Sequence, residues 1–186
     1  MSNLVNYTYW AWDGVLSKEF CNAALAEIDW ATSEKGTVIE ENPVIDPKMR
    51  RTDIVWQSHM QPLGCIARAY IDMANQAAGW GYALSNQETT QIGRYKATDE
   101  GFYDWHEDAS PPRDGMQRKL SVSILLSDPS EFEGGELQFK GMEDRKILTK
   151  QGSIVVFPSF IEHRVTPVTK GVRYSSVTWV QGPSFK

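Results

Sequence analysis

Two segments in the first half of the chain carry apolar residues at helical spacing. The first is predicted to begin at Ser17, a residue that can cap a helix, and to run to about Thr32. The second is predicted from about Pro62 to Ala78 and is followed by Gly79, a residue that commonly terminates helices. We therefore expect two amphipathic helices before the middle of the chain.

The segment between these helices has no regular period. Residues 34–60 carry many charges together with Pro43 and Pro47, so we expect a long loop. One short strand is predicted within it, at about Asp53–Gln57.

From residue 89 onward the pattern changes to short apolar runs separated by turn residues. The clearest run is Leu120–Leu126, in which alternate apolar residues share one face. Gly134-Gly135 and Lys170-Gly171 are typical of hairpin turns or bulges. The predicted strands are residues 89–96, 102–108, 119–127, 135–140, 145–149, 153–157, 162–168 and 172–181. Helices followed by strands favour a sandwich or barrel, of which a jelly roll is one form, over a parallel α/β sheet.

Composition narrows the class of protein. A length of 186 residues suits one domain, and 41% apolar with 23% charged residues excludes a mostly disordered, collagen-like or coiled-coil chain. The net charge of −5 gives no global signature of nucleic-acid or anionic-membrane binding. No apolar run approaches the roughly 20 residues that span a bilayer, and no secretory leader is visible. Cys21 and Cys65 are expected to be reduced thiols in a cytoplasmic protein.

The three histidines of the chain differ in their surroundings. His106 and Asp108 lie two positions apart on a predicted strand, where both would point to the same face and Glu107 would point away. A second imidazole would come from another strand, and His163 is the best candidate. Two histidines and one carboxylate form a triad that leaves three metal positions open, as in non-haem Fe(II) oxygenases. His59 has no comparable acidic partner and is interpreted as an ordinary loop histidine.

An H-x-D pair on its own is also found in surface ion pairs, so the downstream context matters. Arg173 begins a predicted strand that places Ser175 and Trp179 on its face. An arginine in a pocket can bind a carboxylate through two parallel hydrogen bonds, and a nearby hydroxyl can add a third. A metal triad with such a clamp suits a keto acid, whereas without the triad Arg173 would be a solvated strand residue. Trp179 is interpreted as core packing.

The motifs around these residues resemble, in their order, those of prolyl 4-hydroxylase-like Fe(II)/2-oxoglutarate dioxygenases. They are Gln91–Tyr95, Gly101–Asp108, Leu120–Leu126, Ser127–Pro129, Glu133–Leu137 and Phe157–Ser159. The segment His163–Arg173, followed by Trp179–Gln181, resembles the C-terminal part of bacterial PKHD-type hydroxylases. The resemblance covers about residues 88–183, with a weaker similarity at Asp13–Ser17.

The resemblance implies a mainly β fold with N-terminal helices, of the α+β class. The strands would form a double-stranded β-helix, or jelly roll, with the helices packed on one sheet. Residues 1–186 would be a single dioxygenase domain, in which residues 1–88 form a helical support region and residues 89–183 the jelly-roll core.

The resemblance also implies the cofactors. His106, Asp108 and His163 would bind Fe(II) and carry catalysis through it, and Arg173 would bind the distal carboxylate of 2-oxoglutarate. O2 would be the second substrate, and ascorbate could serve as a reductant.

Three further residues match co-substrate positions of the family. Tyr95 occupies the place of a tyrosine that commonly contacts 2-oxoglutarate, although a core or rim aromatic is an equal interpretation. Tyr103 matches another pocket tyrosine, but strand alternation would place it opposite His106 unless the chain bends near Gly101. Ser175 is a candidate contact two residues after the arginine.

The expected reaction is hydroxylation of a C–H bond, with a prolyl residue in a peptide or protein as the leading substrate. An arginine at position 173 resembles the PKHD-type branch, whereas animal and plant prolyl 4-hydroxylases typically have a lysine there, so the protein substrate stays open. An extended peptide could be held by residues 34–60 and 109–118. The alternatives are a dioxygenase for a free amino acid or another small molecule and a non-catalytic jelly-roll binding module. Neither nucleic acid nor a membrane is an expected partner, and the oligomeric state is open.

Overall fold

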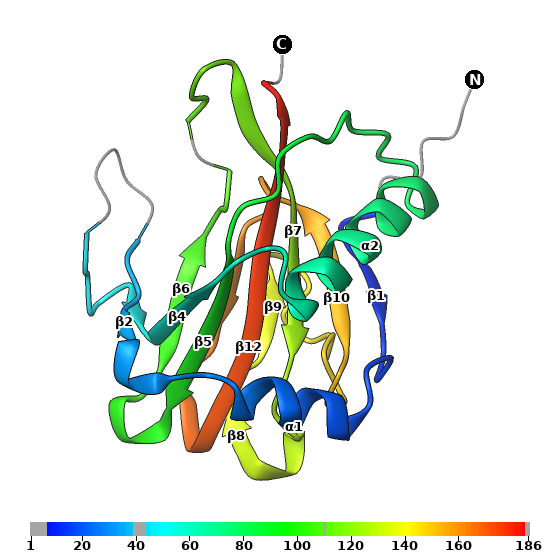
Figure 1. The fold of residues 1–186 in the computed structure, drawn as a ribbon. Coiled ribbons are helices and arrows are strands. Elements are labelled where there is room, and N and C mark those ends of the chain that lie inside the picture. Colours follow the sequence, from blue (N-terminus) through cyan, green and yellow to red (C-terminus); the bar gives the residue numbers. More distant parts are fainter. Residues whose placement is uncertain (1–6, 39–43, 110, 185–186) are drawn as a thin grey trace.

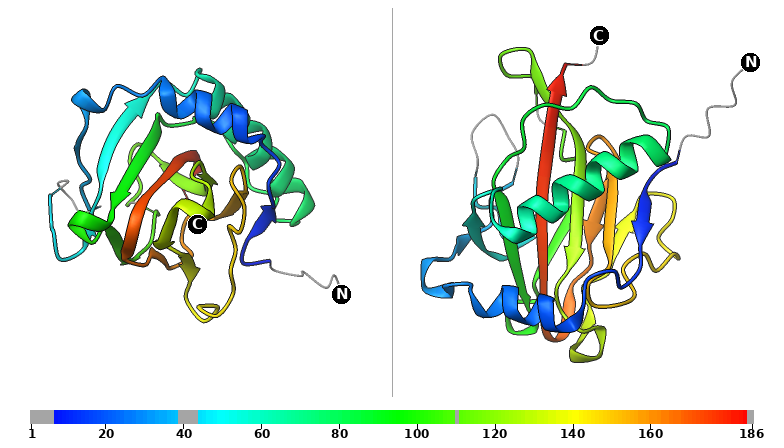
Figure 2. Two further views of the ribbon diagram at one scale, coloured as in Figure 1. Left: turned by 90° about the horizontal axis from the view of Figure 1, so that it is seen from below. Right: turned by 45° about the vertical axis from the view of Figure 1, so that its right-hand side comes forward.

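Two antiparallel sheets face one another, and two helices cover the outer face of the larger sheet (Figures 1 and 2). The computed structural model describes residues 7–38, 44–109 and 111–184. None of the helices in these ranges is both long enough and apolar enough to cross a membrane. The two sheets, with both helices on one of them, agree with the expected mainly β fold with N-terminal helices.

The larger sheet is built mainly from strands far apart in the sequence. Its order is β1 (Trp10–Trp12), β10 (Ile154–Pro158), β7 (Met116–Leu125), β12 (Val168–Pro183), β5 (Thr90–Lys96), β4 (Asp53–Gln57) and β2 (Glu34–Lys35), and β8 (Phe132–Gly134) also pairs with β12. The smaller sheet has the order β3 (Arg50–Arg51), β6 (Phe102–His106), β11 (His163–Val165) and β9 (Leu137–Phe139). The short strands β1 to β4 therefore join both sheets from the N-terminal half.

The first helix, α1 (Lys18–Ala26), is capped as predicted but is shorter than predicted. The Ser17 hydroxyl accepts a hydrogen bond from the Phe20 N–H at 3.2 Å. The helix ends at Ala26, and a separate 3₁₀ turn follows at Trp30–Thr32. The carboxylate of Asp29 caps this turn, because a short acidic side chain binds nearby backbone N–H groups better outside a helix than within one.

The second helix, α2 (Pro62–Ala77), agrees with the prediction almost to the residue. Pro62 lies in its first turn, where its missing N–H costs nothing, and Gly79 follows the helix with a φ of +70°. The buried side of α2, including Leu63 and Ile71, packs with β7 and β10 in one hydrophobic core. This core contains Leu120, Val122, Ile124 and Leu126, the alternating residues that the sequence placed on one face.

The strand prediction succeeds for Asp53–Gln57 and fails for residues 145–149. Those residues contain the buried Ile147 but form no strand. An apolar side chain can be buried from an irregular segment, whereas a strand also needs a backbone partner at hydrogen-bonding distance. The second core, between the two sheets, contains Ile147 together with Phe139 and Phe157.

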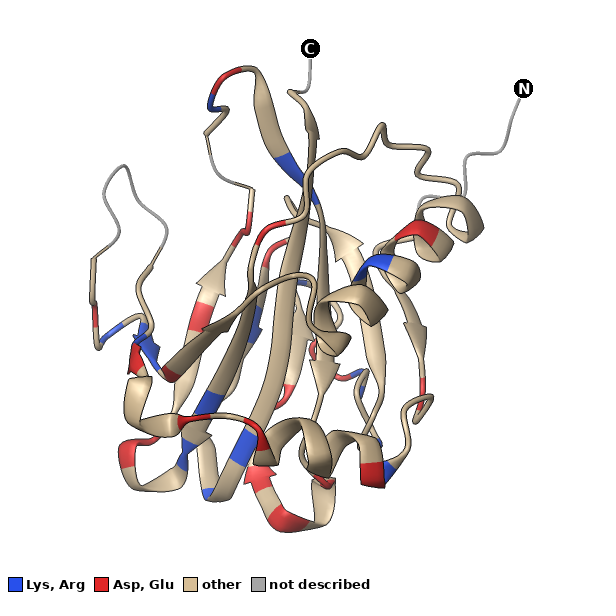
Figure 3. Ribbon diagram, in the orientation of Figure 1, with Lys and Arg blue, Asp and Glu red and all other residues tan. Residues whose placement is uncertain are grey.

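A cluster of cations surrounds one buried carboxylate at the edge of the larger sheet. Asp53 pairs with Lys35 at 2.7 Å, Arg94 at 3.0 Å and Lys96 at 3.1 Å. Figure 3 shows that in this view basic and acidic positions are interspersed along the strands. Burial alone would raise the pKa of the Asp53 carboxyl, but hydrogen bonds from the three cations outweigh it and lower the pKa to about 2.

We expect Asp53→Asn to weaken the fold at neutral pH and to flatten its acid dependence. Because the folded-state pKa is below the ordinary value of 3.8, the stabilisation is complete above that value and is lost as the pH falls toward 2. The loss at pH 7 should be about 1–2 kcal/mol after solvent screening. Urea unfolding of both proteins from pH 7 to pH 3 measures it.

Asp144→Asn is the control, since Asp144 is exposed and has no ion pair within the described part of the chain. An Asp53→Asn protein whose unfolding free energy followed the same pH dependence as this control would contradict the prediction.

Candidate metal centre

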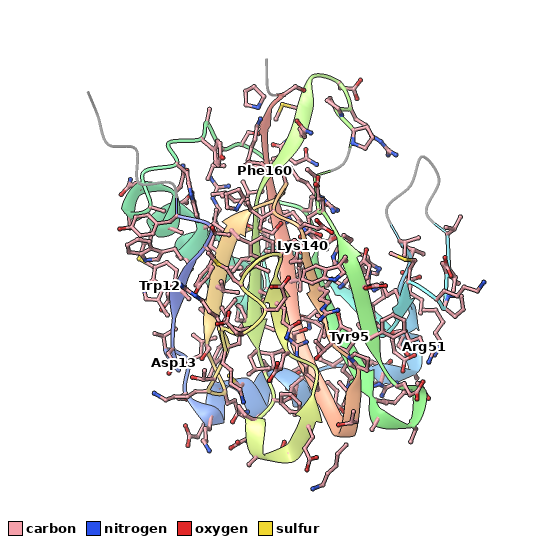
Figure 4. The ribbon with its side chains drawn as sticks, turned by 180° about the vertical axis from the view of Figure 1, so that it is seen from behind. Trp12, Asp13, Arg51, Tyr95, Lys140 and Phe160 are labelled. Atoms are coloured by element: carbon pink, nitrogen blue, oxygen red, sulfur yellow. The ribbon has the colours of Figure 1, made fainter. Side chains whose placement is uncertain are left out.

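A cavity of about 550 Å³ lies between the two sheets. All of the site residues named from the sequence line it: Tyr95, Tyr103, His106, Asp108, His163, Arg173 and Ser175. His59 lies in a turn after β4 and does not line it. Figure 4 shows the molecule from behind, with the buried Tyr95 seen beside β12.

The two histidines and the aspartate converge on one point. The Nε2 atom of His106 lies 3.8 Å from Oδ1 of Asp108, and Nε2 of His163 lies 3.6 Å from Oδ2 of the same carboxylate. The ligand atoms of the three residues all lie within 4.8 Å of one another. This spacing and these donor types fit a divalent transition metal of the Fe(II) class.

Backbone carbonyls orient both imidazoles. Nδ1 of His106 is 2.7 Å from the carbonyl oxygen of Asp104, and Nδ1 of His163 is 2.9 Å from that of Ile161. A carbonyl can only accept, so each Nδ1 carries the proton and each Nε2 keeps a free lone pair. Both lone pairs are therefore available to a metal on the carboxylate side.

Asp108 reaches the site by a route that differs from the predicted one. Strand β6 ends at His106, so Asp108 does not lie on the strand and does not share its face by alternation. Instead, the N–H groups of Asp108 and Ala109 both donate to the carbonyl oxygen of Ser159, each at 2.9 Å. This pair of hydrogen bonds holds the chain after β6 against the segment that leads to His163.

A bulge in β6 explains the position of Tyr103. Opposite β11, His106 pairs with His163 and Tyr103 pairs with Val165, so β6 contains one extra residue between these pairs. The bulge turns Tyr103 and His106 to the same side, where their rings stack with centroids 3.4 Å apart. The bend that brings Tyr103 to the same side as His106 thus lies after Tyr103 and not near Gly101. Burial raises the pKa of Tyr103 to about 12, so its phenol stays protonated.

The electrostatics of the triad suit metal binding. Burial, followed by the proximity of the His163 imidazole, holds the pKa of His106 well below its usual value, so this imidazole is neutral. Burial alone would raise the pKa of Asp108, but the neighbouring His163, His106 and Arg118 outweigh it and lower the pKa. A neutral imidazole and an ionised carboxylate are the forms that bind metals.

Arg173 is a fully buried cation in this cavity. Its side chain is 2% exposed, and its Nη1 donates to Oγ of Ser175 at 3.0 Å. Its guanidinium lies 5.3 Å from the ring centre of Tyr95, its cross-strand neighbour. No carboxylate in the described ranges pairs with it. A buried charge without a partner is costly, so an anionic ligand in this cavity would be strongly stabilised.

The cavity also contains residues that the sequence did not single out. Arg118 forms a bidentate ion pair with Glu88, at 2.8 Å and 2.6 Å, and its guanidinium lies 4.0 Å from the ring centre of Trp179. The register between β7 and β12 shifts next to Arg118. Strand alternation counted along β7 therefore does not predict that this side chain faces the cavity. Trp179 is buried, as expected, but it also lines the cavity.

The indole N–H of Trp179 is buried and has no hydrogen-bond partner among the described residues. A second arginine, Arg50, lies 4.5 Å from the ring centre of Tyr103, and its buried Nη2 has no hydrogen-bond partner in the part of the chain that the structure describes. Unpartnered donors at the wall of a cavity indicate a polar occupant.

Comparison with known proteins agrees with this geometry. The family model of the 2OG-Fe(II) oxygenase superfamily matches residues 90–181. A PKHD-type hydroxylase of Alteromonas mediterranea is 36% identical over 85 residues, which cover 42% of this chain and 38% of that protein. The chain thus matches less than half the length of such curated relatives.

Solved structures match over almost the whole chain. A viral collagen prolyl hydroxylase from Paramecium bursaria Chlorella virus-1 has a TM-score of 0.72 at 20% identity, covering 97% of this chain and 99% of that one. A prolyl hydroxylase from Trichoplax adhaerens, solved with a peptide fragment of a hypoxia inducible factor, has a TM-score of 0.64 at 19% identity and covers 95% and 84%. At this identity the likeness shows a shared fold.

Proposed function

Because the chain belongs to the 2OG-Fe(II) oxygenase superfamily, we propose that it is an Fe(II)- and 2-oxoglutarate-dependent hydroxylase whose substrate is a prolyl residue in a peptide or protein. One observation carries the proposal. A convergent histidine–aspartate–histidine triad lines the same cavity as a buried arginine that has no counter-ion among the described residues. The two facing sheets support assignment of residues 89–183 to a double-stranded β-helix, with residues 1–88 as its support within a single domain.

Each residue has a definite role in this proposal. His106, Asp108 and His163 hold the iron, and Arg173 binds the distal carboxylate of 2-oxoglutarate with help from the Ser175 hydroxyl and Tyr95. Bound Fe(II) supplies the activation of O2, coupled to conversion of 2-oxoglutarate to succinate and CO2. The protein contributes orientation: the carbonyls of Asp104 and Ile161 aim the imidazoles, and the buried walls exclude water.

Two loops at the cavity support a peptide substrate. Thr37 and Val38 line it, and so do Pro111, Pro112 and Arg113. These belong to the segments 34–60 and 109–118 that were expected to hold a peptide; residues 39–43 and Ser110 lie outside the described residues. The Trichoplax enzyme, of similar fold, was solved with a peptide fragment.

The proposal also names a reductant and a cellular compartment. Ascorbate would keep the iron in the ferrous state. A cytoplasmic setting is supported by the two free cysteines, Cys21 and Cys65.

We expect proline-rich peptides to be hydroxylated. Incubation with Fe(II), 2-oxoglutarate, ascorbate and ¹⁸O2 should add one labelled oxygen atom to a prolyl residue, and mass spectrometry should find one succinate for each such product. The matched control is the same peptide with alanine in place of each proline.

The remaining outcomes distinguish the alternatives. Labelled oxygen on a free amino acid, with none on any peptide, would replace the peptide substrate by a small molecule. Absence of 2-oxoglutarate binding to the iron-loaded protein would favour a non-catalytic binding module.

A further inference from the structure

Arg173 lies in the wall between two cavities. Besides the cavity that holds the triad, a second cavity of about 340 Å³ is bordered by Arg173, and Leu137 is the other residue that lines both. The remaining lining of the second cavity comes from Leu125 at the end of β7, from the segments around β8 and from residues 146–149. A space lined by none of the three triad residues therefore also adjoins the buried arginine.

Gly135 touches the stem of this arginine. A Cβ atom built on Gly135 would lie 2.7 Å from Cδ of Arg173 and 2.9 Å from Cγ2 of Val168, closer than real side chains approach. The N–H of Gly135 donates to the carbonyl of Pro167 at 3.2 Å, and β8 pairs with β12 directly before it. The backbone of Gly135 is thus fixed against the strand that carries Arg173.

Two separate constraints act at position 135. The first is the backbone, whose φ of +62° favours glycine. The second is the contact with Arg173. Gly141 has the first constraint without the second, because its φ is +78° and a Cβ built there meets nothing within 4 Å. The chain therefore offers a matched control that isolates the contact with the arginine from the backbone strain.

From this contact we infer that Gly135 is a positioning residue that seats Arg173 for the co-substrate carboxylate. The inference rests on the proposed role of Arg173 in binding 2-oxoglutarate. A methyl group at position 135 displaces Cδ, and with it the guanidinium that donates to Ser175. A bidentate arginine–carboxylate pair tolerates little displacement, so the affinity for 2-oxoglutarate falls. Cavities border the arginine on both sides of this wall, so the displaced side chain has room and the fold survives.

The test compares Gly135→Ala and Gly141→Ala with the wild-type protein. Anaerobic titration of the Fe(II)-loaded proteins with 2-oxoglutarate, followed by the metal-to-ligand charge-transfer absorption, measures the Kd of the co-substrate. Gly135→Ala should raise this Kd by about tenfold or more, and Gly141→Ala should leave it within about twofold. Fe(II) affinity should stay within about twofold in both. In turnover, the KM for 2-oxoglutarate should rise more than kcat falls, and both variants should lose thermal stability to a similar extent.

An unchanged Kd in a folded Gly135→Ala protein would overturn the inference and leave the proposed function intact, whereas a wild-type protein that binds no 2-oxoglutarate would overturn both. If Gly135→Ala does not fold, the double variant Gly135→Ala/Val168→Ala removes the close contact with Val168. The same 2-oxoglutarate titration on this double variant then tests the positioning role. Failure of that double variant to fold, while Gly141→Ala folds, would assign Gly135 to the fold and refute its positioning role.

Discussion

Replacing Asp108 with alanine should abolish tight iron binding and, with it, release of succinate from 2-oxoglutarate. The carboxylate is the only anionic member of the triad, and its two oxygens face the Nε2 atoms of His106 and His163. Loss of a group that merely supports a ligand typically costs about 10–100-fold in metal affinity, and loss of a direct ligand should cost more. Equilibrium dialysis against Fe(II) and a succinate assay measure the two effects.

Glu107→Ala is the matched control for this experiment. Glu107 is the adjacent carboxylate, is exposed and does not line the cavity. It should bind iron and release succinate as the wild-type protein does. Iron affinity that is unchanged in Asp108→Ala, or equally lost in Glu107→Ala, would remove the triad from the mechanism.

Replacing Arg173 with methionine should change ligand binding and stability in opposite directions. Removing the charged partner of a buried carboxylate typically costs about 2 kcal/mol or more, so the Kd for 2-oxoglutarate should rise by about thirtyfold or more. The ligand-free protein should become more stable, because Arg173 is a fully buried charge without a counter-ion among the described residues. Even exchanges of paired buried charges for apolar residues have stabilised proteins by about 1–4 kcal/mol.

Thermal unfolding with and without 2-oxoglutarate checks both effects. The Tm of the iron-loaded wild-type protein should rise with the co-substrate by linkage, and that of the variant should not. Arg164→Met is the control, since Arg164 lines neither cavity and its guanidinium lies over the ring of Trp105, 4.6 Å from the ring centre. A variant at position 173 that retained 2-oxoglutarate affinity, or lost stability without ligand, would contradict the assigned role.

The helices and the principal strands could be predicted from the sequence because their signals are local. Ser17 caps α1, and Pro62 and Gly79 bracket α2, through contacts within one helical turn. Alternation in Leu120–Leu126 likewise identifies the face of β7 that packs under the helices. Residues 145–149 show the limit of this reasoning, because an apolar run indicates burial and does not reveal whether a neighbouring strand is present.

The sequence by itself determined which residue types are available for chemistry: an H-x-D pair, a third ligand at His163 and an arginine at position 173. Only the tertiary structure decided how they meet. Asp108 is aimed by the carbonyl of Ser159, and Tyr103 is turned toward His106 by a bulge. Both depend on backbone partners distant in the chain. Strand periodicity describes a residue relative to its own neighbours, whereas a site depends on register between strands, and a one-residue shift there reverses every side chain.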